Sequence, residues 1–216
     1  EMAIEGDDVQ LDRATNLATI EGPGTLTFPV NQGLFGEALT STELIDVQWR
    51  ERLTFDGQTA EFHTGVKVSI ADSMILCERI IATINERIDF TNPEYNSLEL
   101  ALSTIACRDR MQLKVVEWQV PADGGDPAIQ GIRQGELADF HVNLDSGEFS
   151  AQGPGEIDDW SRGESRRVMI APGSVQANQP AGQERDLPWD YTHLKFTGTL
   201  TGNLHDRVGQ LNDQVE

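Results

Sequence analysis

A phrase that occurs twice constrains this chain more than any other feature. Residues 11–24 read LDRATNLATIEGPG, and residues 144–155 read LDSGEFSAQGPG. Each copy has Leu-Asp, a turn of small residues, a short alternating run and then Gly-Pro-Gly. Self-similarity over this distance is typical of stacked, repetitive β structures, in which one supersecondary unit is used again. The phrase therefore favours a scaffold or a carrier over a catalytic domain.

Polar and apolar residues alternate along much of the chain. The clearest runs are residues 25–28, 49–55, 65–70, 111–115, 140–144 and 194–200. Period-two alternation gives a strand one buried face and one wet face, as in antiparallel or barrel-like sheets. The sequence thus predicts an all-β fold of many short strands, organised as one domain over residues 1–216. Val115 and Val116 break the alternation, which indicates a β-bulge or a strand buried on both faces.

Several stretches do not follow the alternation. Residues 91–97 and 121–130 are rich in Pro, Gly, Asn and Asp, which is typical of loops. Residues 158–189 form a long polar excursion that we expect to be irregular, as a functional loop or a flap. Two short helical turns are expected, one within residues 34–47 and one within 204–213.

The net charge of −20 restricts the partners of this chain. Such a surface repels phosphate backbones and anionic membranes, so nucleic acid is not an expected partner. No stretch approaches the ~20 apolar residues of a membrane span. The chain starts at Glu1 without an initiator methionine, and both ends resemble unfinished strands. We therefore expect a segment of a longer precursor, or a mature product.

The chain has two cysteines, Cys77 and Cys107. In an exported β protein, two cysteines on neighbouring strands form a disulfide if their Cα atoms come within roughly 7 Å. The alternative is a pair of separate buried thiols. The sequence leaves both open.

Three segments resemble the OstA-like (LptA-like) family of lipopolysaccharide-transport and outer-membrane assembly proteins. The first is the hairpin-sized unit, or rung, LTFDGQTAEFHTGVKV at residues 53–68, and the second is the strand SMILCERIIATI at residues 73–84. The third is the pair of Asp-turn-strand-Gly units that end at Gly24 and Gly155. The Gly-Pro-Gly units and the 158–189 excursion depart from the pattern of the compact transport proteins. Stacked rungs of this kind also match a stacked-hairpin β-solenoid.

The resemblance implies an open, twisted β-jellyroll in the periplasm with an apolar inner groove that holds lipid acyl chains. It carries over no catalytic residue and no cofactor, only apolar inward positions. The lipid-groove candidates are Leu26, Phe28, Leu53, Phe55, Phe62, Val66, Val68, Ile80, Ile84, Phe140, Val142, Phe149, Leu194 and Phe196. Because lipid A phosphates are anionic, the acidity of the chain requires a bridging divalent cation or contact with the acyl chains alone.

One basic cluster stands out in this acidic chain. Arg162, Arg166 and Arg167 are candidates for binding a phosphate or carboxylate headgroup, since guanidinium groups bind such anions in a bidentate manner. The alternative is that these arginines pair with the surrounding Asp and Glu.

The common catalytic and nucleotide-binding motifs are missing from the sequence. Glu51 and Glu61 are candidates for a glycosidase-like pair of carboxylates. In a continuous strand Glu51 would point to the same face as Trp49 and Leu53. Edge residues that discourage strand pairing are the more economical interpretation. The scattered histidines are interpreted as surface residues, and Asp7-Asp8 and Asp158-Asp159 match no calcium-loop spacing. No catalytic residue, metal site or cofactor is therefore predicted.

Together these observations predict a non-enzymatic, exported protein that holds or bridges lipopolysaccharide or another amphipathic lipid. The first alternative is a structural β-solenoid that assembles end to end with itself or with other β-jellyroll proteins. The second is a domain that binds or degrades polysaccharide.

Overall fold

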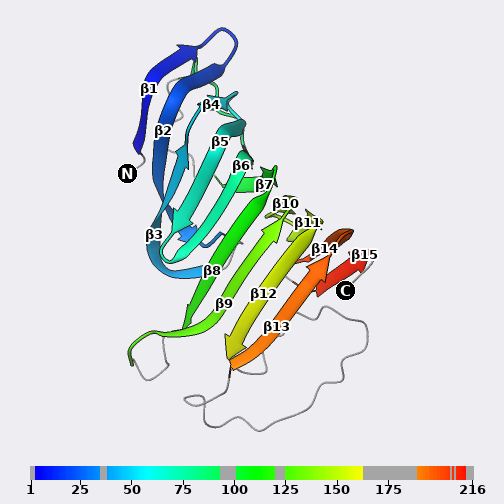
Figure 1. The fold of residues 1–216 in the computed structure, drawn as a ribbon. Helices are drawn as coiled ribbons and strands as arrows, with labels where there is room; N and C mark the ends of the chain where they lie inside the picture. The colour runs from blue at the N-terminus through cyan, green and yellow to red at the C-terminus, as the bar shows by residue number, and fades with distance from the viewer. Residues whose placement is uncertain are drawn as a thin grey trace.

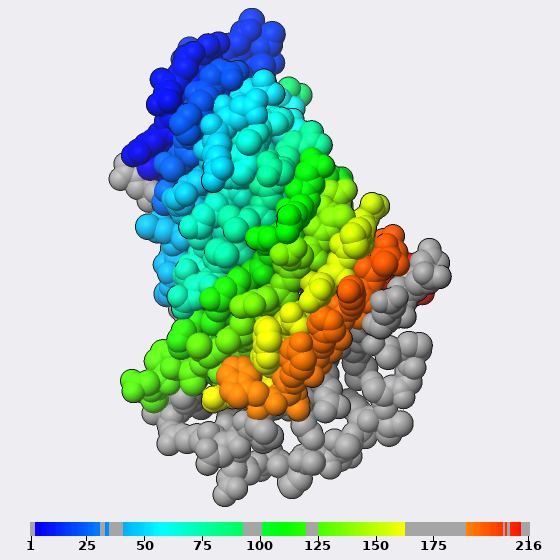
Figure 2. Space-filling view, viewed as in Figure 1, coloured from blue at the N-terminus to red at the C-terminus, as the bar shows by residue number. Residues whose placement is uncertain are grey.

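The computed structural model describes residues 3–34, 38–92, 101–119, 125–162, 189–204, 206 and 208–212. Within these ranges the protein is all-β, as the alternation predicts, and forms one sheet of 15 strands (Figure 1). The strands are β1 (Ala3–Asp12), β2 (Leu17–Gln32), β3 (Ala38–Trp49), β4 (Arg52–Phe55), β5 (Thr59–Ile70), β6 (Ser73–Ile84), β7 (Leu102–Arg108), β8 (Met111–Gln119), β9 (Ala128–Leu137), β10 (Asp139–Asn143), β11 (Glu148–Gln152), β12 (Gly155–Arg162), β13 (Trp189–Phe196), β14 (Thr199–Asn203) and β15 (Val208–Asn212). Their colours run steadily from one end of the stack to the other (Figure 2), so spatial order follows chain order.

The sheet branches into two leaves because its longest strands pair with different neighbours along their length. The first half of β5 pairs with β4 and the second half with β3. Likewise, the first half of β6 pairs with β8 and the second half with β7. We call the leaf of β3, β8, β9, β12 and β13 leaf A, and the leaf of β4, β7, β10, β11, β14 and β15 leaf B. The strands β1, β2, β5 and β6 run through both leaves, one half in each. The inner residues of both leaves belong to one hydrophobic core.

The leaves meet along a seam where strands turn or end. The seam comprises Gly22–Gly24, Arg50–Glu51, Thr64–Gly65, Asp109–Arg110, Ala138, Gly153–Pro154 and Thr197–Gly198. Backbone hydrogen bonds continue across it, from Gly22 N–H to Glu51 O (2.6 Å) and from Arg50 N–H to Thr64 O (3.0 Å). The seam therefore changes strand direction without leaving these groups unpaired.

Both copies of the repeated phrase occupy equivalent places in this fold. In each, a turn leads into a strand of leaf B, and Gly-Pro-Gly then crosses the seam into leaf A. A Cβ atom at Gly24 would overlap the ring of Trp49, and one at Gly155 would overlap the ring of Phe196. The second glycine of each Gly-Pro-Gly unit thus makes room for a buried aromatic ring on the neighbouring strand.

Several sequence-based expectations about local structure are wrong. Residues 38–49 and 208–212 are strands, not helical turns, and no helix occurs among the described residues. Inside 38–49, Ile45 and Val47 alternate with polar residues and are buried, so period two prevails over a helical period. The run 49–55 is also interrupted at the seam rather than continuous.

The boundaries of the irregular stretches also differ from the expectation. Residues 158–162 and 189 belong to β12 and β13, and the rest of the predicted excursion, residues 163–188, lies outside the described part of the chain. Residues 128–130, expected in a loop, begin β9. The β-bulge predicted at Val115-Val116 is wrong, because both residues pair regularly with β9; the register of this pair shifts instead between Glu117 and Trp118. Trp118 is 48% exposed, so β8 is not buried on both faces.

Candidate functional site

Apolar rows cross the inner face of each leaf in register, from one end of the stack to the other. The leaf B row consists of Val9, Ile20, Leu53, Phe62, Ile80, Cys107, Phe140, Ala151, Leu200 and Leu211. The leaf A row consists of Ile4, Leu26, Val47, Val68, Ile75, Leu113, Gly135, Ile157 and Leu194. Directly opposed side chains on neighbouring strands are close enough to pack together. The rows therefore form one continuous apolar interior.

The lipid-groove candidates belong to this interior except Phe55 and Ile84, which lie outside the hydrophobic core cluster. Phe55 packs instead on Phe90, with ring centroids 5.9 Å apart. The candidates that are buried are Leu53, Phe62, Val66, Val68, Ile80, Phe140, Val142, Leu194 and Phe196. Those that are only partly buried are Leu26, Phe28, Phe55, Ile84 and Phe149. Val66 and Met111 are fully buried and Val142 is 1% exposed, so the middle of the interior is packed by the protein's own side chains.

Two hollows in the surface lie at the seam and not inside the interior. One, of about 540 Å³, is lined by Glu5, Asp7, Pro23, Gly24 and Trp49 with their neighbours. The other, of about 410 Å³, lies between Asp109–Arg110, Glu136–Asp139 and Pro154. None of the lipid-groove candidates lines either hollow. An acyl chain would therefore need the leaves to separate, or a contact site at an end of the stack.

The N-terminal end of the stack provides exposed apolar surface. Ile4 and Val9 begin the two inner rows, yet they are 48% and 61% exposed, and Leu11 is 50% exposed. Only β2 pairs with β1 among the described strands, so the outer edge of β1 has no strand partner there. This exposed edge and its apolar face, which we call the open end, suit contact with lipid or with another strand.

The headgroup candidates are not brought together in the described part of the chain. Arg166 and Arg167 lie outside the described residues. Arg162 ends β12, and its guanidinium carbon lies 4.6 Å from the ring centroid of Trp189 on β13. This cation–π contact engages Arg162 with the protein's own aromatic residue.

Cys77 and Cys107 are present as free, buried thiols. They come from neighbouring strands, β6 and β7. The pKa of the Cys107 thiol is raised well above its ordinary value. The largest cause is a hydrogen bond with Cys77, and the second is burial. The two thiols are therefore in contact inside the core rather than separate, and they pack there as small apolar side chains.

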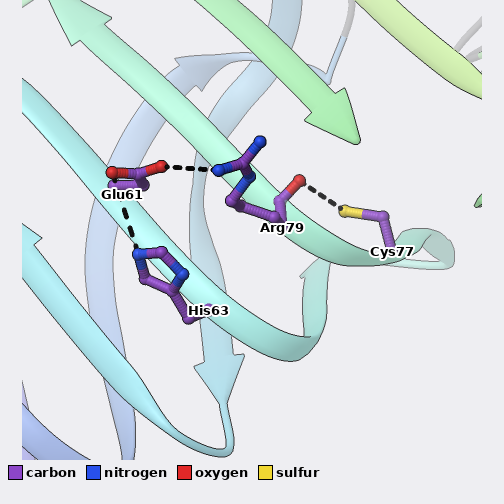
Figure 3. A network of polar contacts seen from close by, with 4 residues as sticks. All are labelled: Glu61, His63, Cys77 and Arg79. Carbon is purple, nitrogen blue, oxygen red and sulfur yellow. Dashed lines mark hydrogen bonds and ion pairs between the residues drawn. The ribbon is translucent and has the colours of Figure 1, made fainter. Parts of the chain in front are cut away.

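The two glutamates considered for catalysis do not form a pair. Glu51 is exposed at the seam and accepts a hydrogen bond from Thr64 Oγ1 at 2.6 Å. Glu61 lies on β5, where it forms an ion pair with Arg79 Nη1 at 3.2 Å and lies 3.8 Å from His63 Nε2 (Figure 3). The expectation that Glu51 shares a strand face with Trp49 and Leu53 is wrong, because the strand breaks at residues 50 and 51.

The two aspartate pairs considered for calcium, Asp7-Asp8 and Asp158-Asp159, are each adjacent residues of a strand. Asp159 points inward on β12, with an Arg133 Nη2 to Asp159 Oδ1 distance of 3.4 Å, and burial raises its pKa. Asp158 points outward, where hydrogen bonds from Tyr191 and then His193 lower its pKa. Asp7 and Asp8 belong to β1. Neighbouring strand residues cannot direct both carboxylates at one ion.

One polar cluster was missed by the sequence reasoning. Glu156, Asp158 and His193 place their ligand atoms within 4.8 Å of one another on β12 and β13. The 35-residue separation of Asp158 and His193 hides the cluster in the sequence. The only local signal is that residues 156 and 158, two positions apart on one strand, point to the same face.

Two other histidines lie elsewhere: His141 is exposed on β10, and His205 lies outside the described residues.

Comparisons with known proteins leave the function to physical argument. No protein-family model matches the chain, and no curated protein matches it. The described residues contain no helix long and apolar enough to cross a membrane.

Proposed function

We propose that this protein is a non-enzymatic, exported lipid-binding and lipid-bridging protein of the lipopolysaccharide-transport or outer-membrane assembly type. Its fold would be an open β-jellyroll of stacked hairpins. The observation that supports this proposal is the pair of in-register apolar rows that begin uncovered at the open end. Burial of apolar surface there contributes roughly 25 cal/mol per Å².

The packed middle of the interior determines how a lipid would bind. An acyl chain would first contact Ile4, Val9 and Leu11, because these inner-face side chains are already exposed. It would go deeper only by separating the leaves on the side opposite the seam. The strongly negative surface requires the anionic headgroup to stay outside or to be bridged by a divalent cation.

Uptake of a fluorescent fatty acid by the delipidated protein tests this proposal. We expect saturable uptake, and we expect Val9→Asp to reduce it because an acyl chain that covers the new carboxylate would remove its hydration at a cost in free energy. Val208→Asp is the matched control, since Val208 is 55% exposed at the opposite end of the stack. Absence of uptake, together with no acyl chain detected by mass spectrometry in the purified protein, contradicts the proposal.

A structural scaffold that assembles end to end is the second candidate. The outer edge of β1, which no described strand covers, favours it, because an open strand edge is a template for pairing with another chain. Concentration-dependent oligomers in light scattering without bound lipid would support the scaffold over the carrier.

A further inference from the structure

The outer face of β12 and β13 carries side chains that take no part in the apolar interior. Asp158 lies directly opposite His193 in the antiparallel register, and Glu156 precedes Asp158 by two positions on the same face. Both strands belong to a continuous sheet, so the backbone holds these three side chains together without a ligand. Figure 2 shows β12 and β13 side by side at the surface.

The distances among the three side chains suit a metal ion. One carboxylate oxygen each from Glu156 and Asp158 and one ring nitrogen of His193 lie within 4.8 Å of one another. His193 Nδ1 is 2.8 Å from Asp158 Oδ1. Bonds of about 2.0–2.2 Å to a tetrahedral ion place ligand atoms roughly 3.3 Å apart. Small side-chain rotations would therefore bring all three atoms onto one ion.

Charge on this face also favours a cation. Glu156 lies directly opposite Glu136 of β9, and opposed like charges destabilise strand pairing. Arg110 Nη2 and Gln112 Nε2 hold the Glu136 carboxylate at 3.2 and 2.9 Å. Within the described ranges, no hydrogen bond or ion pair engages the Glu156 carboxylate. Lys195 stands opposite Glu156 on β13 and would compete with the metal ion for this carboxylate.

A neighbouring residue orients the central ligand. The Tyr191 hydroxyl donates a hydrogen bond to Asp158 Oδ1 at 2.6 Å. The Tyr191 ring packs on Trp160, with ring centroids 5.2 Å apart. Hydrogen bonds of this kind fix the orientation of metal-binding carboxylates and commonly matter to affinity.

We propose that Glu156, Asp158 and His193 form a zinc-binding site on the outer face of β12 and β13. Zn²⁺ accepts imidazole nitrogen together with carboxylate oxygen, and three protein ligands leave a fourth position for water or an external ligand. Ca²⁺ needs six to eight oxygen ligands and Mg²⁺ keeps most of its water, so neither matches this donor set. The site is separate from the apolar interior and does not depend on lipid binding.

Calorimetric titration of the chelator-treated protein with ZnCl₂ tests the site. We expect one Zn²⁺ per chain that excess CaCl₂ does not displace. His193→Ala and Asp158→Asn should each abolish this binding, and Tyr191→Phe should weaken it about tenfold. In NMR spectra of the imidazole nitrogens, Zn²⁺ should shift one ring nitrogen of His193.

His141→Ala is the matched control, because His141 is an exposed strand histidine on leaf B. This variant should bind Zn²⁺ like the unmodified protein, and circular dichroism should show that every variant is folded. Failure of the unmodified protein to bind Zn²⁺ overturns the proposal. Equal binding by His193→Ala, or several weak sites that CaCl₂ empties, overturns it as well.

Discussion

Val9 and Ile20 stand next to each other in the same inner row, yet Val9 is 61% exposed and Ile20 only 3%. Both are β-branched aliphatic residues on the same face of leaf B. Ile20 has Val9 on one side and Leu53 on the other, whereas among the described strands Val9 has a neighbour only on the Ile20 side. Burial in this molecule therefore depends on position in the stack more than on residue type.

This difference separates two roles along one surface. Hydrophobic stabilisation is roughly proportional to the apolar area removed from water. The strands in the middle of the stack, which we call the middle rungs, therefore supply most of the folding free energy. The first rung contributes little to stability but leaves apolar surface available for binding. At the other end of the stack, Leu194 is 8% exposed, so the two ends of the leaf A row are not equivalent.

The largest expected effect compares a middle rung with the first rung. Phe62 is 3% exposed and packs on Trp49 with ring centroids 5.5 Å apart. Phe62→Ala removes this contact and leaves a cavity, so we expect the free energy of unfolding to fall by about 3–5 kcal/mol. Val9→Ala should lower it by less than about 0.5 kcal/mol. Urea unfolding followed by tryptophan fluorescence measures both, and equal losses would contradict the comparison.

A smaller effect is expected at the seam. Gly155 lies against the ring of Phe196 and the side chain of Leu137, both buried in the middle of the interior. Gly155→Ala overpacks this region, so we expect a loss of about 1–3 kcal/mol in the free energy of unfolding.

Gly131→Ala is the control for this substitution. Gly131 is also a strand glycine, but its added Cβ would meet the flexible Glu117 carboxylate at 3.3 Å. It should therefore be tolerated better than Gly155→Ala in the same urea experiment. The reverse order would show that the interior near Phe196 is loosely packed.

The sequence was sufficient to predict the all-β fold, many of its strands and the equivalence of the two Gly-Pro-Gly units, because these are local signals, but it missed strands such as β3 and β15. It was not sufficient to predict the whole seam. Thr64, Asp109 and Arg110 adopt positive φ values of 66°, 61° and 67° there, although none is a glycine. Residues without a conformational signature were forced into this geometry by pairing on both leaves. The seam was therefore visible only where glycine and proline mark it.

The candidate site shows the same limit. Alternation correctly identified inward residues such as Phe62 and Val142, because parity is a local property. Whether the space between them is open depends on how the leaves pack, and that is not local. The cluster of Glu156, Asp158 and His193 was missed for the same reason, since β12 and β13 pair across a long connection.

Cysteine labelling gives a kinetic version of the comparison. Cys107 is fully buried and its pKa is raised, so little reactive thiolate reaches solvent while the protein is folded. We expect iodoacetamide to modify Cys77 and Cys107 only as fast as the protein opens, and to modify Val9→Cys at once. Mass spectrometry over time measures both rates. Rapid native labelling of Cys107 would show that the middle rungs open locally.

The smallest expected effect contrasts the outer and inner faces at adjacent residues. The pKa of Asp158 is lowered from 3.8 by hydrogen bonds from Tyr191 and then His193, whereas burial raises the pKa of Asp159 from 3.8. Ionised Asp158 therefore adds stability above about pH 3.8, and that contribution is lost as pH falls through its folded pKa. Asp159 has the opposite sign, because its ionisation costs stability above pH 3.8 and protonation relieves this cost. NMR titration of the side-chain carboxyl carbons should find Asp158 titrating below Asp159. Tyr191→Phe should raise the pKa of Asp158 and leave the pKa of Asp159 unchanged. The same pKa for both aspartates in the unmodified protein would contradict the comparison, because it would mean that the inner face of β12 is as exposed to water as the outer face.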